Sequence, residues 1–253
     1  MEAQQSLNIH RLYFLIRRHI LSNGKSWLIA YGAIAGTLLV ITLFRGYFQP
    51  TDIGGLTGLY FVVMFIGGYI FTAGIYGELH QPQRSYQYLS LPVSTTERLL
   101  SAWFITAFLF PAVAILTMAL IVFIGNLVMN FTLDVTPFAG VFSAESWSSL
   151  KVYWITQSMF LLGAAYFRGY NFLKTVLALF VISVALQIIA GVTGWILFGT
   201  PGTQVEFGTQ QMSHQFEDIF LRIFPTVARI VFYYLFVPFF LITTWYSLKE
   251  RQV

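Results

Sequence analysis

The sequence predicts an all-α, polytopic membrane protein with six transmembrane helices and an N-terminal interfacial helix. The chain is 57% hydrophobic and only 9% charged, whereas charged residues make up about a quarter of an average soluble domain. Its mean hydropathy is +0.71. Six apolar segments come close to the roughly 20 residues needed to cross a hydrocarbon core. They cover residues 27–47, 56–76, 99–125, 150–167, 172–198 and 225–247.

The domain organisation follows from how closely these segments are spaced. Nearly all of residues 27–247 belongs to the six-helix bundle, so we interpret residues 1–253 as a single transmembrane domain. No stretch between the apolar segments is long enough to fold as a soluble domain with a core of its own. Any catalytic domain that the protein needs is therefore expected on another chain.

Residues 6–22 precede the first apolar segment and show the periodicity of an amphipathic helix. The apolar side chains that share one face are Ile9, Leu12, Leu15, Ile16 and Ile20. Three arginines lie largely on the other face: Arg11, Arg17 and Arg18. This pattern is typical of a helix in the membrane interface, with its apolar face in the acyl boundary and its arginines toward anionic head groups or a partner. A solvated basic leader is the alternative interpretation.

The distribution of Lys and Arg predicts the orientation of the bundle. Of the 14 basic residues, four lie on one side: Arg45, Lys151, Arg222 and Arg229. The others lie on the opposite side: Arg11, Arg17, Arg18, Lys25, Arg84, Arg98, Arg168, Lys174, Lys249 and Arg251. Because cytoplasmic segments carry the excess of basic residues, both termini are expected in the cytoplasm.

Several residues inside the apolar segments predict how the helices pack. The small ones are Gly32 and Gly36 in the first segment and Gly67 and Gly68 in the second. Small residues allow helix backbones to approach closely in a membrane. Pro111 and Pro238 each remove a backbone hydrogen bond, which lipid tolerates only where neighbouring groups satisfy the freed carbonyl. We expect both prolines to kink their helices.

The polar residues inside the fourth and fifth segments are expected to face the bundle or a dimer interface. They are Gln157, Ser158, Ser183, Gln187 and Thr193. None of them is a carboxylate, so the proton or ion site of many secondary transporters has no obvious candidate here.

Catalytic and cofactor-binding patterns are missing from the sequence. The chain has no cysteine, and its four histidines all lie outside the apolar segments. Gly24-Lys25-Ser26 resembles the end of a P-loop, but His19 stands where that motif needs its first glycine. We therefore expect no catalytic site, no bound metal or cofactor, and no nucleic-acid partner.

The connection between the second and third apolar segments, residues 77–98, carries the clearest local signal. Ser94 and Glu97 have the spacing of a capping box, in which each side chain accepts the backbone N–H of the other residue. Pro92 forces Leu91 toward an extended conformation. The pattern predicts a stiff elbow that begins the third transmembrane helix.

The residues ahead of this cap predict a docking surface. Large side chains would be displayed on the cytoplasmic side of the elbow: Tyr86, Tyr88, Leu89 and Leu91. Arg84 and Arg98 flank them. A helix start needs the cap but not exposed apolar side chains in front of it, so we expect another protein to dock here.

The stretch "YLSLPVSTTERLL" resembles the L-P-V-S-x-x-E sequence between the second and third helices of ABC type-2 permeases, the membrane subunits of certain ABC transporters. The basic N-terminal stretch "RLYFLIRRHIL" and the six-span topology are also similar to that family. Leu91, Pro92, Ser94 and Glu97 match the motif. Thr95 and Thr96 depart from the more basic or variable residues of the family.

The resemblance implies a permease subunit, with export the expected direction, in a bacterial inner membrane. The loop would contact a separate ABC ATPase subunit, so ATP would be hydrolysed on that partner, and a second permease subunit would complete a homo- or heterodimer. Arg84, Tyr86 and Tyr88 would lie on the docking side. A second cytoplasmic contact is expected in "FRGYNFLK", at Arg168, Tyr170, Asn171 and Lys174.

Two other functions stay open at the level of the sequence. The protein could be an accessory or sensory six-helix membrane protein that recruits a cytoplasmic partner without transport. A membrane enzyme would need an intramembrane polar constellation that the sequence does not contain.

Overall fold

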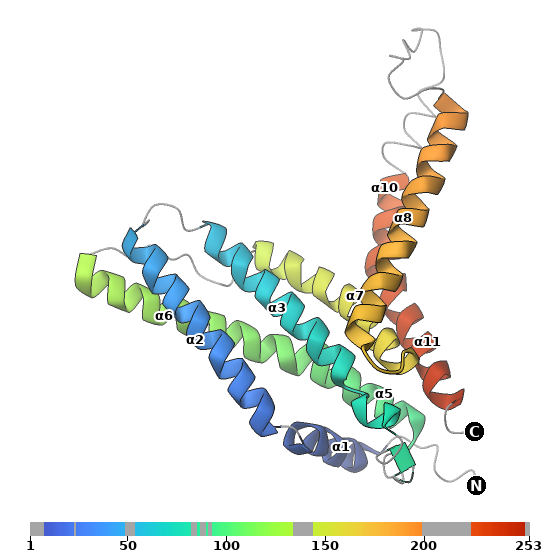
Figure 1. Ribbon diagram of the computed structural model, residues 1–253, viewed down its shortest axis with the longest axis horizontal. Coiled ribbons are helices and arrows are strands. Elements are labelled where there is room, and N and C mark those ends of the chain that lie inside the picture. The colour runs from blue at the N-terminus through green and yellow to red at the C-terminus, as the bar shows by residue number, and fades with distance from the viewer. Residues whose placement is uncertain are drawn as a thin grey trace.

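The computed structural model describes residues 8–22, 24–48, 54–81, 85–86, 90, 93–133, 144–198 and 224–250. Within these ranges every regular element is a helix, which confirms the all-α prediction (Figure 1). The elements are α1 (Ile9–Ser22), α2 (Gly24–Phe48), α3 (Gly54–Gly74), η2 (Gly77–His80), α5 (Thr95–Phe104), η3 (Ile105–Leu109), α6 (Phe110–Leu133), α7 (Ala144–Tyr166), α8 (Asn171–Phe198), α10 (Phe224–Ile230), η5 (Val231–Leu235) and α11 (Phe236–Glu250).

Helices in the described part of the chain provide five candidate membrane spans. They run over Trp27–Phe48, Leu56–Gly74, Thr95–Thr132, Asn171–Thr193 and Val231–Glu250. Each coincides with one of the predicted apolar segments, so a multi-pass membrane protein is supported. The remaining predicted segment, 150–167, lies in α7 except for its last residue, and α7 is not apolar enough to be counted with them. A sixth span therefore stays a prediction.

Helix α7 is less apolar because it lies at the centre of the structure. It packs against α3 on one side and against α8 and α11 on others. Tyr153, Gln157 and Ser158 are polar side chains of α7 that are fully buried. A helix covered by other helices can carry such residues, since they find hydrogen-bond partners inside the protein.

The buried apolar side chains form two clusters. The first joins α2, α3, α6 and α7 and includes Leu38, Tyr60, Met64, Met118 and Tyr153. The second joins η2, α5, α7 and α11 and includes Tyr76, Leu79, Leu99, Leu161 and Leu248. Helix α7 contributes to both clusters, so it links the two halves of the core.

Helices α5, η3 and α6 form one continuous helix with a π-helical turn ahead of Pro111. In this turn the N–H of Phe110 bonds to the carbonyl of Ile105, so the Thr106 carbonyl loses its usual donor. The Ala107 carbonyl also lacks one, because Pro111 has no N–H.

Two side chains of α7 satisfy these carbonyls. The Tyr153 hydroxyl donates to the Thr106 carbonyl at 2.9 Å, and the Trp154 indole N–H donates to the Ala107 carbonyl at 2.7 Å. This confirms that neighbouring groups replace the bonds lost near Pro111. Pro238 likewise follows a π-helical turn, η5.

Helix α8 differs from the rest of the structure in its exposure. Figure 1 shows α8 rising with α10 and α11 at an angle to the layer formed by α2, α3 and α6. Of the five polar residues expected to face the bundle or a dimer interface, Gln157 and Ser158 are buried in the bundle. Ser183, Gln187 and Thr193, all on α8, are exposed in the single chain. Their placement in a dimer interface stays a prediction.

The glycines of the first two apolar segments differ in whether they contact another helix. A Cβ atom added at Gly68 of α3 would lie 2.9 Å from Cζ of Tyr153, so this glycine permits the close approach of α7. A Cβ atom added at Gly32 or Gly36 of α2 would meet no heavy atom within 4 Å. The expected packing role of Gly32 and Gly36 is therefore wrong for contacts within this chain, because their side of α2 faces outward.

Candidate functional site

The capping box predicted at the start of the third apolar segment is present. Ser94, with an extended backbone (φ −72°, ψ 157°), precedes the first residue of α5. Its hydroxyl accepts the Glu97 N–H at 3.2 Å, and the Glu97 carboxylate accepts the Ser94 N–H at 2.9 Å. The cap therefore sets where the long helix of α5, η3 and α6 begins.

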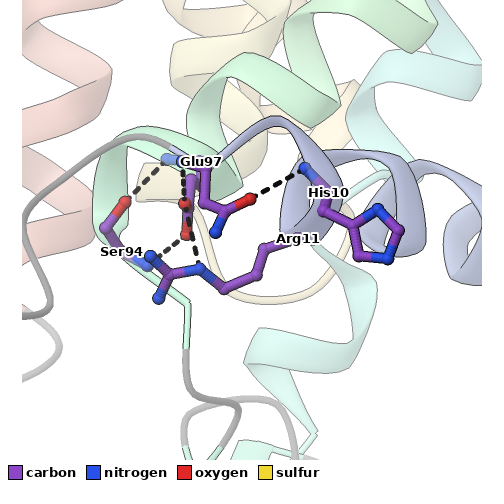
Figure 2. A network of polar contacts seen from close by, with 5 residues as sticks. His10, Arg11, Ser94 and Glu97 are labelled. Atoms are coloured by element: carbon purple, nitrogen blue, oxygen red, sulfur yellow. Dashed lines mark hydrogen bonds and ion pairs between the residues drawn. The ribbon is translucent and has the colours of Figure 1, made fainter.

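The Glu97 carboxylate also holds the beginning of α1. Its second oxygen, Oε1, accepts the Asn8 backbone N–H at 2.8 Å and lies 3.5 Å from Nε of Arg11 (Figure 2). The carboxylate is fully buried. One acidic side chain thus joins the N-termini of two helices that are 89 residues apart in the sequence. We call Asn8, Arg11, Ser94 and Glu97 the α1–α5 junction.

Two features make this junction favourable for a negative charge. The free N–H groups at the start of a helix carry a partial positive charge, and here two helix starts converge on one carboxylate. The Arg11 guanidinium adds a full positive charge nearby. A buried carboxylate with several charge-assisted partners is stable in place, whereas the loss of one partner leaves a charge uncompensated.

A second ion pair holds the other end of α1. Nη2 of Arg18 lies 3.0 Å from Oε2 of Glu78, which belongs to the short helix η2. Two of the three arginines expected to point toward head groups or a partner therefore pair with acids of the same chain. Their positions correct that expectation, because they lie on the side of α1 that packs on the protein. Arg17 is exposed.

The apolar side chains of α1 are divided between its two sides. Leu15 is buried against the protein. The exposed ones include Ile9, Tyr13, Phe14, Ile20 and Leu21. An exposed apolar side suits contact with lipid, and the position of α1 in the membrane interface stays a prediction.

His19 occupies the last turn of α1, near the second ion pair. Burial lowers the pKa of His19 below its ordinary value of 6.5; the Glu78 carboxylate opposes this effect, and Arg18 adds to it. Because the folded-state pKa is depressed, the neutral imidazole is favoured in the folded protein. Its contribution to the docking of α1 is complete above pH 6.5 and decreases as the pH falls below that value.

The predicted docking residues of the 77–98 loop differ in their exposure, and some of them are not described by the structure. Arg84, Tyr88, Leu91 and Pro92 lie outside the described residues. The Tyr86 side chain is 79% exposed, so it is free to meet a partner. Arg98 is only 3% exposed, which corrects its expected place on the docking side. Helices α1 and α11 both pack against α5 and leave this side chain inside the protein.

The second predicted contact forms the turn between α7 and α8. Gly169 and Tyr170 both have positive φ values, 65° and 50°. The Tyr170 carbonyl accepts the Lys174 N–H at 3.0 Å, and the Lys174 ammonium donates to the Arg168 carbonyl at 2.7 Å. These bonds hold a tight turn in which the Tyr170 side chain is 83% exposed.

The two predicted contact regions meet in the structure. The Asn171 side-chain amide donates to the carbonyl of Ala73, at the end of α3, at 3.3 Å. The His80 imidazole Nε2 donates to the Ala164 carbonyl at 2.7 Å. An open groove of about 450 Å³ lies between the two regions. Its lining comes from α3, η2 and the start of α8: Ile70, Ala73, Gly74, Gly77, His80, Gln81, Gly169, Tyr170, Asn171, Phe172 and Leu173.

The sequence did not predict the contacts that four residues make at this end of the molecule: Asn8, Arg11, Glu78 and His80. Asn8 carried a usable signal, because it directly precedes the periodic run of α1 and Asn is a favoured N-cap residue. Its side-chain oxygen accepts the His10 N–H at 2.9 Å. The partners of the other three residues are distant in sequence and had no local signal.

In the described ranges, no group of three or more His, Asp or Glu side chains could hold a metal ion. Comparisons with protein-family models, with curated proteins and with solved structures find no match to this chain.

Proposed function

We propose that the protein is the membrane-spanning permease subunit of an ABC transporter of the type-2 kind, with export as the direction of transport that the family resemblance implies. It works with a second permease subunit and with separate ATPase subunits on the cytoplasmic side of a bacterial inner membrane. The proposal is supported by the resemblance of residues 88–100 to the permease motif and by the helical, strongly apolar chain. ATP is bound and hydrolysed by the partner ATPase.

The observation that carries the proposal is the buried Glu97 at the α1–α5 junction. A force on the loop ahead of Ser94 acts on a helix start that is tied to α1 through Asn8 and Arg11. From Thr95 the helix continues to Thr132 as a candidate membrane span. Movement at the loop is therefore passed along a continuous helix and not absorbed at a flexible joint.

The π-helical turn gives this movement a route into the bundle. Carbonyls freed at Thr106 and Ala107 are held by Tyr153 and Trp154 of α7. Helix α7 in turn packs against α3, α8 and α11. A tilt of the long helix thus changes the position of the central helix, which is what a transport cycle driven by a cytoplasmic ATPase requires.

Exposed aromatic side chains supply the contact surface. Tyr86 is 79% exposed and Tyr170 is 83% exposed, and they belong to the two regions that meet beside the groove. Exposed large side chains of this kind are typical of protein-binding surfaces. Arg84, Tyr88, Leu91 and Pro92 extend this surface according to the sequence.

The first experiment tests complex formation. The full chain, tagged and expressed with the ATPase encoded by the neighbouring gene, is expected to purify with that ATPase. Tyr86→Ser should weaken the association. The matched control Tyr47→Ser should not, because Tyr47 is also exposed (59%) but lies in the last turn of α2, outside the predicted docking loop. A chain that never associates with the ATPase would remove the proposal.

The second experiment tests coupling through Glu97. In the assembled complex, Glu97→Gln keeps the side-chain shape but removes the charge that Arg11 and the two backbone N–H groups hold. We expect the rate of transport-coupled ATP hydrolysis to fall in this variant, while the chain is still inserted into the membrane. The accessory or sensory alternative predicts partner capture with no effect of ATP analogues on the conformation of this chain, and unchanged coupling in Glu97→Gln would contradict the role given to Glu97.

A further inference from the structure

The groove beside the α7–α8 turn opens between two helices that bear exposed apolar side chains. We call it the α3–α8 groove. One wall is the end of α3, with Ile70, Ala73 and Gly74, and the other is the start of α8, with Phe172 and Leu173. Its volume is about 450 Å³. Figure 1 shows α3 and α8 diverging from this end of the molecule.

The apolar walls continue beyond the groove along both helices. On α3, Ile66 is 49% exposed and Ile70 is 47% exposed. On α8, Leu173 and Leu177 are each 62% exposed. Both stretches belong to candidate membrane spans, so in a bilayer these side chains would face hydrocarbon and not water. The shape and chemistry suit an acyl chain that lies between the two helices.

Two cations stand next to lining residues of the groove in the sequence: Arg168 precedes Gly169, and Lys174 follows Leu173. Arg168 and Lys174 are exposed, and in the described part of the chain neither forms an ion pair. The bond from the Lys174 ammonium to the Arg168 carbonyl keeps both residues at the turn that borders the groove. Basic residues at the end of a groove between transmembrane helices favour an anionic lipid headgroup.

A polar acceptor is also available in the lining. Oδ1 of Asn171 is buried and has no hydrogen-bond partner among the described residues. Its amide nitrogen is already used, since it donates to the carbonyl of Ala73 at 3.3 Å. A buried acceptor without a donor is unfavourable, and a headgroup hydroxyl would satisfy it.

We propose that the α3–α8 groove binds an anionic phospholipid. The headgroup phosphate lies near Arg168 and Lys174, and one acyl chain follows Ile66 and Ile70 on α3 and Leu173 and Leu177 on α8. This inference goes beyond the proposed transport function and does not depend on an ATPase partner. It gives Arg168 and Lys174 a lipid ligand, in place of the protein contact expected from the sequence.

The headgroup is tested by native mass spectrometry of the full chain in detergent. Phosphatidylglycerol and phosphatidylcholine with identical acyl chains are titrated separately. Each basic residue near an anionic headgroup strengthens binding by about fivefold. The double variant Arg168→Gln, Lys174→Gln is therefore expected to bind phosphatidylglycerol about 25-fold more weakly, with phosphatidylcholine binding unchanged.

The acyl-chain part is tested with a glycine pair. A Cβ atom added at Gly74 or at Gly36 would meet nothing within 4 Å, so neither substitution creates an overlap at that atom. Gly74→Leu fills the groove and should weaken phosphatidylglycerol binding on the order of tenfold, because about two CH₂ groups of the chain lose their place. Gly36→Leu, on the open side of α2, should leave binding unchanged.

Four results would overturn the proposal. The first is equal binding of the two lipids by the unsubstituted chain, and the second is equal effects of Gly74→Leu and Gly36→Leu. The third is full displacement of phosphatidylglycerol by inorganic phosphate, which would indicate a free-anion site without the acyl chain. The fourth is a loss of ATPase binding in the Arg168, Lys174 double variant with lipid binding intact, which would assign these cations to a protein contact.

Discussion

Helices α7 and α8 follow each other in the chain but have opposite relations to their surroundings. Helix α7 carries buried polar side chains such as Gln157 and Ser158 and is covered on several sides. Helix α8 is long and apolar enough to span a membrane, and its residues 176–193 are almost all exposed. The more apolar of the two helices is therefore the more exposed one.

In a water-soluble protein the more apolar helix is the more buried one. The reverse relation between α7 and α8 is expected for a protein in lipid. In water, apolar side chains are driven into the core, whereas a bilayer solvates them as well as a protein core does. Between these two helices, the higher hydropathy of α8 accompanies exposure, and the lower hydropathy of α7 accompanies contact with other helices. Helix α8 is accordingly among the candidate spans and α7 is not, although residues 150–167 form an apolar segment in the sequence.

Truncation of a large aromatic side chain should distinguish the two helices most strongly. Tyr153 of α7 is fully buried, and its ring stacks 6.0 Å from that of Tyr69. We expect Tyr153→Ala to lower the free energy of unfolding by about 3–5 kcal/mol. Phe180→Ala on α8, where the side chain is 63% exposed, should change it by less than about 0.5 kcal/mol. Unfolding by SDS in mixed micelles measures both, and equal losses would contradict the comparison.

A charge placed on the exposed side of α8 tests whether this helix faces the hydrocarbon of the membrane. Leu186 is 60% exposed in the middle of this helix, and Lys at such a position costs about 3 kcal/mol in membrane insertion. We expect Leu186→Lys to shift much of the chain out of the membrane fraction. The matched control is Leu21→Lys on α1, outside the candidate spans, where the exposed Leu21 should be replaced without loss of insertion. Full insertion of Leu186→Lys would mean that α8 does not face hydrocarbon.

A pair of glycines gives the smallest effect and the finest test. A Cβ atom added at Gly163 of α7 would lie 2.9 Å from Cβ of Thr175 on α8, closer than packed side chains allow. We expect Gly163→Ala to lower the free energy of unfolding by about 1–3 kcal/mol. Gly191→Ala, which meets nothing within 4 Å, should leave stability unchanged or raise it by up to about 1 kcal/mol. Thermal denaturation in detergent compares the two, and a similar loss in both would show that α8 is packed along its length.

The local features of the candidate site could be predicted from the sequence. The capping box of Ser94 and Glu97 needs only residues three apart, so its two hydrogen bonds follow from the local chain. The helical character of residues 9–22 follows from periodicity in the same way. The burial of Arg98 could not be predicted, because it depends on how α1 and α11 cover α5.

The contacts between residues distant in the sequence could not be predicted either. Glu97 caps its own helix and also accepts the Asn8 N–H, 89 residues away. Arg18 and Glu78 lie 60 residues apart and meet at 3.0 Å. Both pairings depend on the place where α1 packs on the bundle, and no spacing within the chain encodes that place directly.

The sequence by itself determined the solvent of this protein, its helical class, five apolar spans and the start of the long third helix. These properties depend on composition, on periodicity and on hydrogen bonds between near neighbours. Only the tertiary structure decided that α7 is central and α8 is exposed, and that one carboxylate joins two helix starts. In a bilayer, apolar helices gain no hydrophobic energy by packing against one another, so hydropathy cannot rank them by burial. Their arrangement is decided by side-chain fit and by polar contacts between distant segments, such as those of Glu97 and Tyr153.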